Sequence, residues 1–123
     1  MKKVQSEAYV EAFLNECFEI LNSETFNPYI DFSVNDRDKN NNFMNKYQYS
    51  LEDAVNIVRQ LTVNDYCESD IRENEAFIFG KKNKVEIYIK IITDYNFGRR
   101  TVICISFHEA EYEMVYPYRR LNK

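Results

Sequence analysis

Hydrophobic residues recur with a helical period in the first half of the chain and with a strand period in the second. In 5-QSEAYVEAFLNECFEILNSE-24 the apolar residues fall three or four positions apart, which predicts an N-terminal helix within residues 1–24. The segment 50-SLEDAVNIVRQL-61 predicts a second helix, with Ser50 and Asp53 in capping-box positions. Between them, the polar, Asn-rich residues 35–49 are predicted to form a loop.

Alternation of apolar and polar residues, which is typical of strands, appears in one early run and in three later ones. Residues 29–34 alternate as a short strand, and residues 68–75 form an acidic connector. The runs 76–80, 84–92 and 101–107 then predict three strands of an antiparallel meander, joined by turns at 80–83 and 94–98. We therefore expect one α+β domain over residues 1–123, with helices packed on one face of the sheet.

Alternation within the last two strands separates a core face from a polar face, because residues i and i+2 of a strand share a face. The predicted core face carries Val85, Ile87, Ile89, Ile91, Ile103, Ile105 and Phe107. The opposite face carries Glu86, Tyr88, Lys90, Cys104, Ser106 and His108. Since a meander places these strands side by side, four polar residues are expected to lie close together: Tyr88, Lys90, Ser106 and His108.

Charge is distributed unevenly along the chain. The net charge is −4, which by itself argues against a nucleic-acid partner. Residues 1–80 hold 7 Lys and Arg against 15 Asp and Glu, whereas residues 81–123 hold 9 against 5. Such an asymmetry is typical of proteins with one side that faces a polyanion.

The cysteines and the hydropathy pattern indicate a cytoplasmic protein that needs no cofactor or metal. Cys17, Cys67 and Cys104 are odd in number and widely spaced, which favours free thiols and fits no zinc motif. We expect no membrane span, because the apolar runs fall short of about 20 residues, and no signal peptide at the basic start of the chain.

The predicted polar face carries residue types that suit metal-independent RNA cleavage. His108, the one histidine, can act as acid or base near neutrality, and Lys90 can stabilise the phosphate. Tyr88 can donate a hydrogen bond or stack on a base. An ordinary surface histidine at the end of a strand remains the alternative. Tyr118, in the Tyr-rich run around Pro117, either covers a sheet edge or stacks on bases.

Several segments together resemble the MqsR-type toxins of bacterial toxin–antitoxin systems. The resemblance covers roughly residues 29–119 and is carried by 61-LTVNDY-66, 76-AFIFGK-81, 86-EIYIKI-91 and 104-CISFHEAEYEMVYPYR-119. It implies a RelE/ParE-like fold and an mRNA endoribonuclease that blocks translation and is held in check by a cognate antitoxin protein.

The resemblance also implies roles for individual residues. Tyr88 and His108 occupy catalytic positions of the family, and Tyr66 matches an aromatic position near its site. With Lys90 as a third catalytic residue, the expected substrate-binding residues are Tyr66, Arg72, Ser106, Arg99, Arg119 and Tyr118. Two other functions stay open: a non-catalytic factor that binds a protein through its acidic half, as from a phage or mobile element, and a degenerate toxin without activity.

Overall fold

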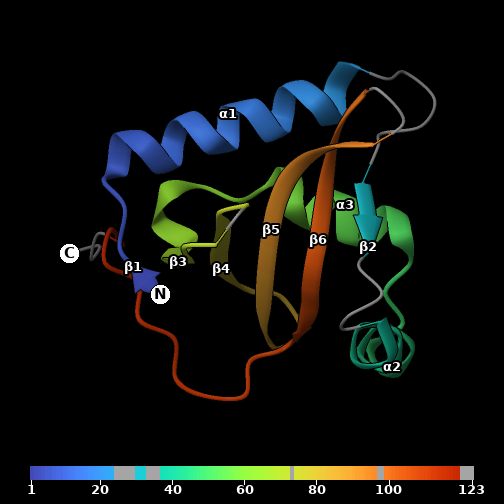
Figure 1. Cartoon of the computed structure of the whole chain (residues 1–123). Coiled ribbons are helices and arrows are strands. Elements are labelled where there is room, and N and C mark those ends of the chain that lie inside the picture. The colour runs from blue at the N-terminus through green and yellow to red at the C-terminus, as the bar shows by residue number, and fades with distance from the viewer. Residues whose placement is uncertain (24–29, 33–36, 73, 97–98, 120–123) are drawn as a thin grey trace.

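A computed structural model describes residues 1–23, 30–32, 37–72, 74–96 and 99–119 (Figure 1). Within these residues the chain forms three α-helices: α1 (Glu7–Ser23), α2 (Arg37–Tyr47) and α3 (Leu51–Arg59). It also forms six strands: β1 (Lys2–Lys3), β2 (Ile30–Phe32), β3 (Tyr66–Asp70), β4 (Ala76–Lys82), β5 (Glu86–Asn96) and β6 (Arg99–Glu109). None of the described helices is long and apolar enough to span a membrane.

The strands form one sheet in the order β1-β3-β4-β5-β6-β2. Neighbours from β1 to β6 are antiparallel, so the meander and the α+β class are confirmed. The strand β2 joins the other edge and runs parallel to β6. Strand β4 ends two residues later than predicted and β5 begins two residues later, which moves the first turn to residues 83–85. Strand β5 also continues to Asn96, so the prediction of a turn over residues 94–96 is wrong. Of the second predicted turn, Phe97 and Gly98 lie outside the described residues.

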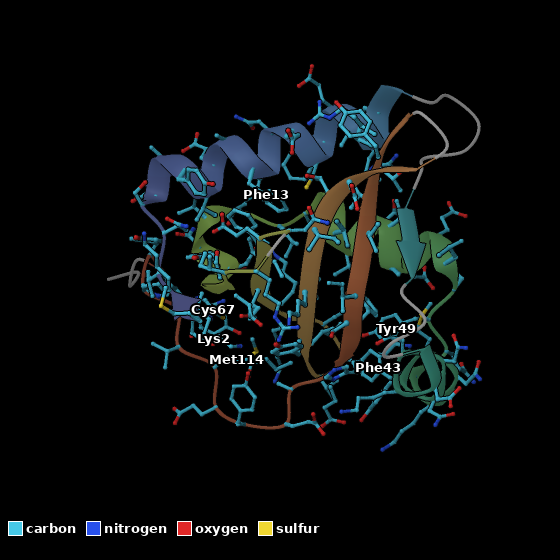
Figure 2. All side chains as sticks on the ribbon, in the orientation of Figure 1. Lys2, Phe13, Phe43, Tyr49, Cys67 and Met114 are labelled. Carbon is cyan, nitrogen blue, oxygen red and sulfur yellow. The ribbon has the colours of Figure 1, made fainter. Side chains whose placement is uncertain are left out.

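All three helices contribute side chains to a core on one face of the sheet (Figure 2). Phe13 of α1 stacks on Phe77 of β4, with ring centroids 3.8 Å apart. From the sheet, the core receives the fully buried Ile87, Ile89 and Ile91 of β5, as the alternation predicts. A smaller apolar cluster of Cys67, Ile78 and Met114 lies on the other face.

Two capping boxes lie on the segment that leads into β3. The Ser50 side chain accepts a hydrogen bond from the Asp53 N–H, and Asp53 accepts one from the Ser50 N–H, as predicted. Thr62 and Asp65 repeat this arrangement around the short 3₁₀ turn Val63–Asp65. The second box fixes the chain immediately before β3 begins at Tyr66.

The prediction of a loop over residues 35–49 is wrong, because residues 37–47 form α2. Asn40 of this helix is fully buried. Its amide nitrogen donates to the Ile105 carbonyl at 3.2 Å, and its oxygen accepts from the Phe107 N–H at 2.8 Å. These bonds satisfy backbone groups of β6 that lie beyond the stretch paired with β2. Phe43 is also buried, so tertiary contacts rather than intrinsic propensity explain this polar helix.

The prediction of a connector over residues 68–75 is also wrong in its first part. Residues 66–70 form β3, which pairs with both β1 and β4. Ser69 and Asp70 are buried despite their polarity. Ser69 shares a hydrogen bond with the Tyr66 hydroxyl, and Asp70 is surrounded by cations, so both polar side chains are satisfied inside the sheet.

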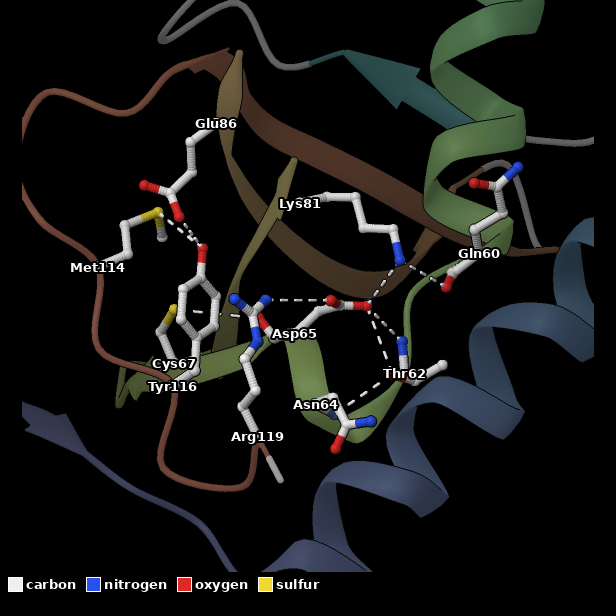
Figure 3. Close-up of polar contacts among 10 residues, drawn as sticks. All are labelled: Gln60, Thr62, Asn64, Asp65, Cys67, Lys81, Glu86, Met114, Tyr116 and Arg119. Carbon is white, nitrogen blue, oxygen red and sulfur yellow. Dashed lines mark hydrogen bonds and ion pairs between the residues drawn. The ribbon is translucent and has the colours of Figure 1, made fainter. Parts of the chain in front are cut away.

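After β6, residues 110–119 cross the sheet face that lies opposite α1 and return toward β1 (Figure 1). We call this stretch the C-terminal strap. The Tyr116 hydroxyl donates to Glu86, and the Arg119 guanidinium lies 3.7 Å from the Tyr116 ring centroid and 3.6 Å from Asp65 (Figure 3). A Cβ built at Gly80 would overlap the Tyr116 ring, so glycine permits the close approach of the strap to β4.

Candidate functional site on the polar sheet face

Four of the predicted site residues form two cross-strand pairs on β5 and β6, and we call these four residues the polar row. Tyr88 pairs with His108, and Lys90 pairs with Ser106. The Tyr88 and His108 rings are stacked, with centroids 5.3 Å apart and planes 12° from parallel. The predicted gathering of these four residues on one sheet face is therefore confirmed.

An irregularity in β6 changes the prediction for its other half. Lys90 pairs with Ser106 but Ile91 pairs with Cys104, so Ile105 is an extra residue in a bulge. The bulge reverses the alternation before it, and Cys104 is fully buried in the helix-side core. The predicted place of Cys104 on the polar face is therefore wrong, and Ile103 and Ile105, predicted for the core, are partly exposed.

Backbone structure orients the His108 ring. The Nδ1 atom lies 3.0 Å from the carbonyl oxygen of Glu109. A carbonyl only accepts, so Nδ1 must carry the hydrogen of this bond. In the neutral imidazole the unprotonated nitrogen is then Nε2, which is the form that a general base requires.

Three positive groups in or near the polar row pair with one buried carboxylate, that of Asp70. Asp70 Oδ2 lies 2.9 Å from the Arg72 guanidinium and 3.5 Å from Lys90 Nζ, and Oδ1 lies 3.4 Å from the N-terminal ammonium of Met1. Burial alone raises the pKa of the Asp70 carboxyl, but the hydrogen bond and charge of Arg72, with Lys90 and the N-terminus, outweigh it. The pKa of Asp70 is therefore held below its ordinary value, and the carboxylate stays charged.

Tyr88 is positioned as a hydrogen-bond donor. Burial raises the pKa of its hydroxyl well above the ordinary value, and the neighbouring Tyr112, Glu68 and Asp70 raise it further. Tyr112, from the C-terminal strap, packs edge-on against the Tyr88 ring at 6.1 Å. The phenol therefore remains protonated throughout the neutral pH range.

The other predicted site residues are divided between the neighbourhood of this row and more distant places. Arg72 lies near the polar row, because its guanidinium pairs with Asp70, which also pairs with Lys90. Tyr66 is fully buried on the helix side, where Tyr118 stacks on it at 6.1 Å, and the Tyr118 hydroxyl donates to the Gln5 carbonyl at 2.6 Å. The contacts of these two tyrosines therefore hold the C-terminal strap against the N-terminal segment.

The two remaining arginines differ in their distance from Tyr88 and His108, since Arg119 stacks on Tyr116, which packs with Tyr88 against one apolar cluster. Arg119 belongs to the Asp65 cluster of Figure 3. Arg99 pairs with Asn96 at the far end of the β5–β6 hairpin, and its side chain is outside the described part of the structure. Nine positions separate Arg99 from His108, which amounts to roughly 30 Å of strand.

His108 reaches a surface cavity from the side of α2. His108 is 6% exposed, and it lines a cavity of about 340 Å³ between α2 and the end of β6. Lys39, Lys46 and Tyr47 line the same cavity. The sequence interpretation missed these three residues because it treated α2 as a loop. It also missed Asp70, whose partners are distant in sequence.

Comparison of the chain with protein-family models, curated proteins and solved structures finds no match.

Proposed function

We propose that the protein is a metal-independent mRNA endoribonuclease, the toxin of a toxin–antitoxin pair, with a RelE/ParE-like fold. The observation that carries this proposal is the register of β5 and β6, which places Tyr88 beside His108 and Lys90 beside Ser106. Phosphodiester cleavage by a neighbouring 2′-hydroxyl needs a base for the hydroxyl proton, a proton donor for the leaving oxygen and a cation for the phosphate charge.

Each group has a role in this reaction. The His108 Nε2 accepts the proton of the 2′-hydroxyl as its oxygen attacks the adjacent phosphorus. The bond to the 5′-oxygen breaks and the leaving oxygen takes a proton from water, which gives a 2′,3′-cyclic phosphate and a 5′-hydroxyl end. The proton taken up by His108 then returns to the solvent. Lys90 stabilises the phosphate charge, and the protonated Tyr88 donates a hydrogen bond to it.

The test is induced expression in bacteria of the wild type, His108→Ala, Lys90→Ala and the control Lys3→Ala. Lys3 is an exposed lysine on the edge strand β1, so its loss removes the same charge without touching the row. We expect growth arrest and new 5′-hydroxyl RNA ends with the wild type and Lys3→Ala, and neither with His108→Ala. Arrest of equal strength by His108→Ala at equal soluble protein would refute the assigned mechanism.

A second function is favoured by the charges themselves. Lys90 and Arg72 both contact Asp70, which offsets the positive charge available to a phosphate. This pairing suits a non-catalytic protein-binding factor or a toxin that has lost its activity. Absence of arrest with every variant, combined with capture of a defined protein partner, would favour that function.

A further inference from the structure

The cavity beside His108 is built from an element that the catalytic proposal does not use. Helix α2 forms one wall and the end of β6 forms the other. The residues that line it are Lys39, Asn42, Phe43, Lys46, Tyr47, His108, Glu109, Ala110 and Glu111. The cavity thus combines aromatic rings, two lysines and two glutamates with the proposed catalytic histidine.

The aromatic wall is ordered by contacts of its own. Phe43 is buried and lies 5.1 Å from the Tyr47 ring, and the Tyr47 hydroxyl donates to Glu109 at 3.1 Å. The Lys46 ammonium lies 5.3 Å from the Tyr47 ring centroid, so positive charge stands beside the aromatic surface. Rings flanked by lysines are typical of sites that bind single-stranded nucleic acid, where bases stack and phosphates pair with the cations.

We propose that this cavity binds one nucleotide of single-stranded RNA, with its base against Tyr47 and its phosphate beside Lys39 and Lys46. This inference rests on the proposed nuclease function and names the subsite that delivers the chain to His108. Because His108 lines the cavity, a nucleotide held there has its backbone next to the assigned base. The helix α2 is then the substrate-positioning element of the protein.

The ion pair that now occupies the rim does not prevent this binding. Lys39 Nζ lies 3.1 Å from Glu111, and the two side chains are 49% and 62% exposed. Exposed pairs of this kind are weak, so an RNA phosphate can replace Glu111 as the partner of Lys39. Lys46 lies near the Tyr47 ring and is exposed.

Binding is measured by fluorescence anisotropy with a 5′-labelled single-stranded RNA of mixed sequence. The protein is His108→Ala, or His108→Gln if the alanine variant is poorly folded by circular dichroism, so that the RNA remains intact. On this background Lys39→Gln, Lys46→Gln and Tyr47→Leu are compared with the control Lys3→Gln. We expect each lysine change to lower the slope of log affinity against log salt by about 0.7, which is the value for one phosphate on a single strand.

Loss of the Tyr47 ring should weaken binding by about tenfold, as expected for one stacked base, while Lys3→Gln changes neither quantity. In the cleavage assay with otherwise wild-type protein, the same three changes should raise KM more than they lower kcat. RNA binding that depends on these residues in a protein without cleavage would support the subsite and overturn the nuclease proposal. Cleavage that is indifferent to all three would overturn the subsite alone, and absence of RNA binding at low salt would overturn both.

Discussion

Replacing Asn40 with alanine removes both hydrogen bonds by which α2 holds β6. The amide is fully buried and bonds to the Ile105 carbonyl and the Phe107 N–H. Leaving a buried backbone group without a partner costs about 1–3 kcal/mol, and the Ile105 carbonyl lies in a partly buried bond, so the two losses together amount to about 2–4 kcal/mol. Alanine recovers about 0.5 kcal/mol through its higher helix propensity, which leaves a net loss of about 1.5–3.5 kcal/mol.

A matched control separates the bonds to β6 from the change in helix propensity. Asn41 is the next residue of α2 and is exposed, so Asn41→Ala makes the same chemical change without the buried contacts. Urea unfolding followed by circular dichroism should give a free energy of unfolding about 1.5–3.5 kcal/mol lower than that of the wild type for Asn40→Ala, and a Tm lower by about 5–18 °C. A difference between the two variants below about 0.5 kcal/mol would refute the argument that Asn40 anchors α2 to β6.

Three further predictions concern other parts of the fold. Gly80→Ala should lower the free energy of unfolding by about 1–3 kcal/mol in urea, because the new methyl group would lie 2.9 Å from Met114 Sδ and overlap the Tyr116 ring; an unchanged midpoint would contradict the close approach of the strap. Asp70→Asn should have a lower free energy of unfolding than the wild type at pH 7. This difference should vanish as the pH falls through the lowered pKa of Asp70, because protonation of the wild-type carboxylate removes the charge that the variant lacks. A difference that grows on acidification would contradict the lowered pKa of Asp70. Burial raises the pKa of the Cys67 thiol to about 12, and Cys17 and Cys104 are also buried, so Ellman's reagent at pH 8 should leave the three thiols unmodified in the native protein and label them promptly in urea.

The core face of β5 and the polar ends of β5 and β6 were predictable because alternation within one strand is a local property. Ile87, Ile89 and Ile91 are buried as expected, and His108 stacks on Tyr88 across the pair. The bulge at Ile105 was not predictable from the same pattern. One inserted residue exchanges the two faces of the preceding stretch, and both faces there carry apolar residues, so the sequence offers no break in polarity to mark it.

The segments that were misassigned are those whose structure depends on distant partners. Helix α2 is rich in asparagine, a poor helix former, and is stabilised where Asn40 and Phe43 contact β6. The end of β3 carries Ser69 and Asp70, whose partners include Tyr66, the N-terminus and Lys90. Local composition alone therefore favours a loop and a connector at positions where tertiary contacts form a helix and a strand.

Charge provides the clearest case in which the structure alters an argument from sequence. Residues 81–123 carry an excess of cations, yet Lys81 and Arg119 pair with Asp65, and Lys90 pairs with Asp70. The acidic first part of the chain thus neutralises cations of the second part within the fold, and the asymmetry in sequence does not translate into an equally basic surface. In the proposed complex, Lys90 contacts the phosphate at which cleavage occurs, and Lys39 and Lys46 of the acidic part contact the phosphate beside the cavity. The contacts of Lys39 and Lys46 correspond to about 1.4 of the salt slope, so the expected affinity for RNA is modest, and in this proposal specificity comes from the cavity beside His108.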